Sequence, residues 1–270
     1  MLAEKAGFSA EDFIEMVQKD ETFYEAFKNL RRTRYDQETT MQFEDGRKGI
    51  VTYESTLVQS LDAGCRVLKV KKETFSDRYY KGKRQKNRYY TSALYHRLFG
   101  QTGRYCQTEL VNQVKATERS MEEHVDAMKQ LIFSPGQPAD IPFMSSKTAI
   151  FSEKMHDRYT FHIRSQLYEN VHPAYVFEVR LKPEYNSGGD NRTLIKSMTT
   201  WFSKDDFQVL GRTYQLSQKA LFYSFDVEMD IQLTKTEGLY VPERIRYKGW
   251  WNIPTKRKEE GQFSIHFTFY

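Results

Sequence analysis

The six histidines are the residues that could most directly supply metal-binding or acid–base chemistry. They are His96, His124, His156, His162, His172 and His266. A zinc site needs ligands at short, fixed spacings, as in an HExxH helix or in closely spaced cysteine and histidine pairs. Glu122, Glu123 and His124 are adjacent in the sequence, but no second histidine follows at that spacing. We therefore expect structural or surface roles for the histidines and no metal site.

Motifs for nucleophilic catalysis or phosphate binding are not found in the sequence. It has no GxSxG elbow, and Cys106 has no adjacent activating partner. The glycines at 46, 49, 64, 82, 100 and 103 are expected in turns and do not form a phosphate loop. The paired carboxylates Asp205-Asp206 and Glu259-Glu260 lie in expected turns, where solvation accounts for them. The sequence therefore predicts neither an enzyme active site nor a cofactor.

The two cysteines, Cys65 and Cys106, limit the covalent chemistry of the chain. Two cysteines exclude a disulfide-dense scaffold and a zinc site built from cysteines alone. They could form a disulfide in an oxidising compartment, or they could be two unrelated thiols. The sequence leaves both interpretations open.

A basic segment flanked by two tyrosine pairs is the clearest local concentration of charge. It lies between Tyr79-Tyr80 and Tyr89-Tyr90, and its cations are Lys81, Lys83, Arg84, Lys86 and Arg88. Interleaved aromatic and basic side chains suit an anionic membrane surface, and they can also stack on bases. The whole chain has a net charge of only +5 and no RNA-binding signature, so we expect no nucleic-acid partner. The alternative is a solvated hairpin whose tyrosines pack sideways.

The elements that would position these residues follow from length and periodicity. The 270 residues suffice for one large domain, and an aromatic content of 15% argues against disorder. No run of about 18 apolar residues exists, so no membrane-spanning helix is expected. Helical spacing predicts helices over about 10–30 and 120–133, and a period of two predicts roughly ten strands from residue 35 onward.

Together these elements predict a single domain over 1–270 of the α+β class, mainly β, with a helical insert at about 92–135. Many long, strictly alternating strands form an antiparallel sheet with one buried face, and such a sheet curls. The expected architecture is a curved antiparallel half-barrel whose concave face is covered by the N-terminal and central helices.

The apolar side chains of the concave face are the candidate ligand contacts. They are Phe161, Phe177, Phe225, Val227, Met229, Ile231, Phe263, Ile265 and Phe267. An apolar concavity with few polar groups is the usual form of a lipid-binding site. The alternative is that these side chains are ordinary core residues, packed against the helices.

Several short segments resemble the outer-membrane lipoprotein-sorting family, the LolA-like half-barrels. The segments are Tyr175–Val179, Thr199–Lys204, Phe225–Val227 and Gly238–Ile245, together with the opening helix that leads into Tyr35 and Met41. The chain is still more similar to a set of uncharacterised secreted proteins of Bacteroidetes-type bacteria, through Phe23–Phe27 and Lys147–Phe151. The resemblance implies an incomplete antiparallel barrel with a helical lid.

The resemblance also implies a function without catalysis. We expect a periplasmic or outer-membrane-associated binding or carrier protein for a lipid, a lipoprotein acyl chain or another apolar ligand. Its leader would have been removed, it would contact the membrane only peripherally, and an envelope protein could be its partner. The alternative is a structural or interaction protein with a filled core, which binds a partner through an edge strand or the basic hairpin at 79–90.

Overall fold

The structure is a computed structural model that describes residues 10–44, 49–83, 85–106, 131–137, 145–186, 193–219, 224–253 and 258–270. Most of the helix expected at 120–133, His124 included, lies outside the described residues, and 131–133 are helical. Within the described part, no helix is both long and apolar enough to cross a membrane.

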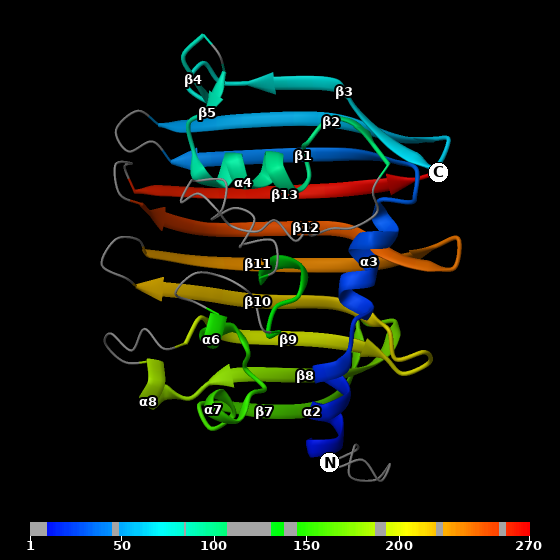
Figure 1. The fold of residues 1–270 in the computed structure, drawn as a ribbon, viewed down its shortest axis with the longest axis vertical. Helices are drawn as coiled ribbons and strands as arrows, with labels where there is room; N and C mark the ends of the chain where they lie inside the picture. The colour runs from blue at the N-terminus through cyan, green and yellow to red at the C-terminus, as the bar shows by residue number, and fades with distance from the viewer. Residues whose placement is uncertain are drawn as a thin grey trace.

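A single eleven-stranded antiparallel sheet forms the body of the protein, in the order β6-β3-β2-β1-β13-β12-β11-β10-β9-β8-β7 (Figure 1). The strands are β1 (Tyr35–Glu44), β2 (Ile50–Asp62), β3 (Cys65–Phe75), β6 (Gly103–Tyr105), β7 (Tyr159–Tyr168), β8 (His172–Leu181), β9 (Ile195–Ser203), β10 (Val209–Lys219), β11 (Ser224–Thr236), β12 (Leu239–Asn252) and β13 (Glu259–Phe269). The sheet is curved and does not close into a barrel, which confirms the expected fold class. Pairing of β1 with β13 joins the two halves of the chain.

The helices lie on one face of this sheet (Figure 1). They are α2 (Ala10–Lys19), α3 (Thr22–Leu30), α4 (Tyr90–Leu98), α6 (Ser145–Thr148), α7 (Glu153–His156) and α8 (Pro183–Asn186). In α3, Phe23, Ala26, Phe27 and Leu30 are buried at helical spacing, so one face of the helix packs on the sheet. The predicted N-terminal helices and their position are therefore correct.

Strict alternation along the strands places one set of side chains under the helices. A row of directly paired residues crosses five strands from Met229 through Tyr247, Phe263 and Met41 to Tyr53. All five are at most 3% exposed. The Tyr247 and Phe263 rings stack with centroids 4.8 Å apart. Because a slip of one residue would turn each strand's apolar set toward solvent, this row fixes the register of the sheet.

One local prediction is wrong. β13 begins at Glu259, so Glu259 is a strand residue that is 6% exposed and not a solvated turn residue. The reason is a tertiary contact, because its carboxylate caps a helix.

The hairpin expected at 79–90 is present. Its strands are β4 (Tyr80–Lys81) and β5 (Lys86–Asn87), which form a separate two-stranded sheet. Of the tyrosines that flank it, Tyr79, Tyr89 and Tyr90 are buried in the core.

His96 on α4 belongs to a buried hydrogen-bonded chain under the sheet. Ser92 Oγ donates to the Tyr79 hydroxyl at 2.7 Å, and the Tyr79 oxygen lies 3.0 Å from His96 Nε2. Burial lowers the pKa of His96 to about 4, against a small opposing effect of Glu73. The neutral imidazole is therefore the form that the fold accommodates.

We expect this histidine to make the protein less stable in mild acid. The folded-state pKa lies below the unfolded value of about 6.5, so the contribution is complete above pH 6.5 and is lost as the pH falls toward 4. Between pH 7 and pH 5 the free energy of unfolding should fall by about 2 kcal/mol from this group alone. Urea unfolding at both pH values tests this, with His96→Gln expected to flatten the slope and the exposed His162→Gln expected to leave it unchanged. An unaltered slope in His96→Gln would contradict the assignment.

Candidate ligand-binding cavity

The nine predicted ligand contacts lie in the packed core. Eight of them are at most 3% exposed: Phe177, Phe225, Val227, Met229, Ile231, Phe263, Ile265 and Phe267. Phe161, the ninth, is partly buried and packs against the same cluster. None of the nine lines the cavity under α2 and α3, whereas Met229 and Phe263 belong to the lining of a second cavity on the other face of the sheet. Their role in binding therefore stays a prediction, and most of the concave face is filled by side chains.

A cavity of about 580 Å³ remains on the helix-covered face, between the α2–α3 junction and the segment 131–137. Its volume lies within the range of small-molecule sites. Apolar side chains from four parts of the chain form much of its wall: Val17, Phe23, Phe133, Phe151 and Met198. Polar and charged side chains complete the lining, so the cavity under these two short helices is amphipathic.

A buried ion pair borders this cavity. Arg212 on β10 and Asp20 between α2 and α3 have side chains that are each 7% exposed, with Arg212 Nη2 3.9 Å from Asp20 Oδ2. Arg212 Nε donates to Thr200 Oγ1 at 2.9 Å, and its guanidinium lies 4.3 Å from the centre of the Phe23 ring. Burial lowers the pKa of Arg212 to about 10, while Asp20 opposes that shift, so the guanidinium stays charged at neutral pH.

The Asp20 carboxylate is only partly satisfied. Its Oδ1 accepts hydrogen bonds from the hydroxyl and the backbone N–H of Thr22, at 2.8 and 3.3 Å. Its Oδ2 is buried without a hydrogen-bond partner among the described residues. A buried acceptor without a hydrogen-bond partner lowers the stability of the folded protein, so the contact between Asp20 and Arg212 is a locally unfavourable part of the cavity wall.

Two further hydrogen bonds hold the covering helices. Thr22 Oγ1 accepts the Val209 N–H of β10 at 3.3 Å. Gln137 Nε2 donates to the Gln18 carbonyl of α2 at 2.6 Å. The α2–α3 junction is thus tied to the sheet below it and to the segment 131–137 beside it.

A second cavity of about 580 Å³ lies on the opposite, polar face of the sheet. Its lining includes Glu228, Asp230, Arg246 and Lys248, and Arg246 is ion-paired with Asp230. The cavity under α2 and α3 also has charged side chains in its lining: Lys19, Asp20, Glu21, Lys28 and Arg212. It differs in lying on the helix-covered face, where the buried apolar side chains of Val17, Phe133 and Met198 form part of its wall. It is therefore the candidate site for a ligand with an apolar body.

The described residues contain no group of three or more histidine, cysteine or acidic side chains that could hold a metal ion. The charged groups in the cavity lining are Lys19, Asp20, Glu21, Lys28 and Arg212, and of these the side chains of Asp20 and Arg212 are the most buried. A desolvated guanidinium binds anionic or carbonyl oxygens strongly. The arrangement can therefore bind and orient a ligand with an oxygen-bearing head and an apolar body.

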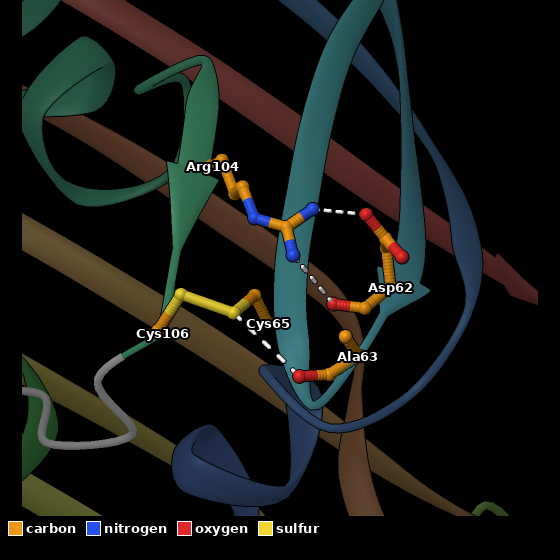
Figure 2. The surroundings of a disulfide bond; sticks show 5 residues. All are labelled: Asp62, Ala63, Cys65, Arg104 and Cys106. Atoms are coloured by element: carbon orange, nitrogen blue, oxygen red, sulfur yellow. Dashed lines mark hydrogen bonds and ion pairs between the residues drawn. A yellow bond between two sulfur atoms is a disulfide. The ribbon is translucent and has the colours of Figure 1, made fainter.

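The two cysteines form a disulfide between Cys65 at the start of β3 and Cys106 just after β6 (Figure 2). Figure 2 also shows Arg104 paired with Asp62 across the same turn. The bond closes a loop of 41 residues, which corresponds to a stabilisation of about 4 kcal/mol from loop entropy. The disulfide joins β6 to β3. The two strands pair only over Arg66–Leu68 of β3.

The basic hairpin places its cations on the surface. Lys81, Lys83, Lys86 and Arg88 are exposed, and Arg84 lies outside the described residues. The flanking Tyr79, Tyr89 and Tyr90 are instead buried in the core. The aromatic rings therefore anchor the hairpin and, Tyr80 aside, are not available to stack on a partner.

Comparisons with known proteins were informative only at the level of structure. No protein-family model matches the chain, and no curated protein does. Among solved structures, an outer membrane lipoprotein-sorting protein domain from Vibrio parahaemolyticus is 9% identical, with 96% of this chain and 94% of that chain covered at a TM-score of 0.31. A LolA superfamily protein from Nitrosomonas europaea is 11% identical, with 92% of each chain covered at a TM-score of 0.27.

A third similar structure is a DUF1329 family protein from Desulfovibrio piger, 12% identical, with 98% of this chain and 90% of that chain covered at a TM-score of 0.25. Two of these three solved structures are of the group that the sequence segments resemble. The chain is a large open antiparallel sheet with helices on one face, the class of fold that the sequence predicted.

Proposed function

We propose that this chain is a non-catalytic binding or carrier protein for a lipid, a lipoprotein acyl chain or a similar apolar ligand. The observation that carries the proposal is the cavity of about 580 Å³ beneath α2 and α3, whose wall is part apolar and part charged. The ligand's apolar body would lie against Val17, Phe133 and Met198, and an oxygen-bearing end would approach Arg212. Binding would need no cofactor.

Uptake and release would occur by movement of α2 about the junction at 20–21. In α3, four of the nine residues are buried and hydrophobic. In α2, Phe13 and Val17 are the buried residues among Glu11–Lys19. Elements with less buried apolar surface open at a lower free-energy cost. α2 is therefore the part of the covering that would lift first, while α3 stays on the sheet.

In this proposal the protein works in the periplasm or at the outer membrane, where an envelope protein would deliver or receive the ligand. The Cys65–Cys106 disulfide supports the location, because structural disulfides persist in oxidising compartments.

A filled-core interaction protein is the second candidate, and one observation favours it. Eight of the nine predicted contacts are buried in the packed core, and none of the nine lines the cavity under α2 and α3. Such a protein would bind partners through an edge strand or the basic hairpin and would take up no apolar ligand.

Titration with a fluorescent fatty acid, followed by native mass spectrometry, separates the two candidates. We expect saturable uptake of one molecule per chain. Ser134→Trp, which places an indole in the cavity, should weaken it at least tenfold. Thr213→Trp, on β10 beside Arg212 but facing the opposite cavity, is the matched control and should change affinity less than twofold. Absence of uptake by the unmodified protein would remove the carrier function and leave the interaction protein.

A further inference from the structure

The sheet edge formed by β3 is covered by a neighbouring strand over only part of its length. β6 covers this edge only at Arg66–Leu68, and every residue from Lys69 to Phe75 is exposed. Figure 1 shows β3 at the margin of the sheet, with the β4–β5 hairpin beside its end. Among the described strands, none pairs with this edge of Lys69–Phe75. The second half of β3 therefore exposes both of its faces and its outer backbone edge to solvent.

The positive charge of the protein is concentrated at this margin. Residues 69–88 include nine basic and two acidic residues, an excess of seven. The whole chain has an excess of five, so the other 250 residues together carry a net charge of −2. An asymmetry of this kind orients a protein toward an anionic surface.

Exposed apolar side chains lie at the same margin, on the side of β3 that meets the hairpin and opposite to Lys69 and Lys72. Val70 is 50% exposed and Phe75 is 39% exposed. The centroids of the Phe75 and Tyr80 rings are 5.0 Å apart. The neighbouring Tyr79 is fully buried, and its ring stacks on that of Tyr53 with centroids 4.5 Å apart. The cations and the apolar groups are thus held on a rigid base and not on a loose loop.

We propose that this margin is a docking surface for an anionic phospholipid bilayer. We call it the basic edge surface, and it consists of Lys69, Val70, Lys71, Lys72, Phe75, Lys81, Lys83, Lys86 and Arg88. Clustered lysines and arginines bind negatively charged lipid surfaces, and apolar side chains beside them enter the head-group region. Lys71 is held by Asp36 at 3.1 Å and contributes less than the others.

Two observations favour a membrane over a nucleic acid. The exposed Val70 and Phe75 gain from hydrocarbon contact and gain nothing from phosphate, and the disulfide is typical of compartments outside the cytoplasm. The docking surface is also separate from the cavity under α2 and α3. Either proposal can therefore fail without the other.

Vesicle co-sedimentation tests the proposal. We expect the protein to sediment with vesicles of phosphatidylglycerol and phosphatidylcholine, to stay in solution with phosphatidylcholine alone, and to be released in 0.5 M NaCl. A variant with four substitutions should lose at least tenfold in partitioning while keeping its fatty-acid uptake. The substitutions are Lys69→Gln, Lys72→Gln, Lys81→Gln and Lys83→Gln.

The control makes the same change in net charge elsewhere on the surface. It consists of Lys154→Gln, Lys219→Gln, Lys235→Gln and Lys248→Gln, all at exposed positions. We expect it to partition within twofold of the unmodified protein. Equal losses in the two variants would overturn the assigned surface. A failure to sediment with anionic vesicles, or tighter binding to a single-stranded oligonucleotide at the same ionic strength, would overturn the lipid assignment.

Discussion

Replacing Asp20 by asparagine should lower the free energy of unfolding by about 3 kcal/mol, because it leaves a buried guanidinium without its counter-charge. Asparagine keeps an oxygen that can accept the hydrogen bonds from Thr22, so the substitution removes mainly the charge. The side chains of Asp20 and Arg212 are both 7% exposed, and in such surroundings the lost attraction is poorly screened by water.

A double-substitution cycle tests the pairing directly. Asp20→Asn combined with Arg212→Met should regain much of the lost stability, since no unpaired charge then remains in the interior. The neighbouring Glu21→Gln is the matched control, because Glu21 is exposed and should change stability by less than about 0.5 kcal/mol. Urea unfolding is measured for the unmodified protein, the single variants Asp20→Asn and Arg212→Met, the double variant and the control. Additive losses in the double variant would show that Asp20 and Arg212 do not interact.

The second large effect is expected at Glu259. This residue begins β13, and its buried carboxylate caps the amino end of α4. Its oxygens accept the backbone N–H groups of Tyr90 and Thr91 at 2.6 and 2.8 Å and the Thr91 hydroxyl at 2.8 Å. A carboxylate at a helix amino end also meets the positive end of the helix dipole. Three buried donors depend on this one side chain.

We expect Glu259→Ala to lower the free energy of unfolding by about 3 kcal/mol, since hydrogen bonds to a buried charged group are worth about 1.5–3 kcal/mol each and the donors are left unsatisfied. Glu259→Gln should cost less, because one oxygen remains to accept from Thr91. Glu260→Ala, on the exposed side of the same strand, should have almost no effect. Equal stability of Glu259→Ala and Glu260→Ala in urea unfolding would rule out the capping role.

The contrast between Asp20 and Glu259 shows how far the sequence could predict the site. Glu259 lies next to a second glutamate in a stretch that is typical of a turn, and nothing local indicates that it faces a helix 168 residues away. Arg212 follows a glycine, and a register shift between Val209 and Gly211 in the pairing with β9 breaks the simple alternation of β10. Inspection for a charged residue at an inward position could have found Arg212, but only with the register known.

The predicted apolar face illustrates the opposite case. Phe225, Val227, Met229 and Ile231 alternate so clearly that their common burial follows from the sequence. Whether buried residues line an empty space depends on what packs against them, and periodicity carries no information about that. The cavity instead lies where α2 and α3 meet the segment 131–137 and Arg212 of β10, which are distant from one another in the chain.

The sequence by itself determined the quantities that depend on local pattern. Period-two alternation fixed a mainly antiparallel sheet with one wet face, and helical spacing at 10–30 fixed the covering helices. The basic segment and the two cysteines were also visible. Only the tertiary structure decided the disulfide, the buried Asp20–Arg212 and Glu259 contacts, the cavity and the junction of β3 with the hairpin. Each of these depends on distances between segments remote in sequence, and such distances are set by the packing of the whole sheet.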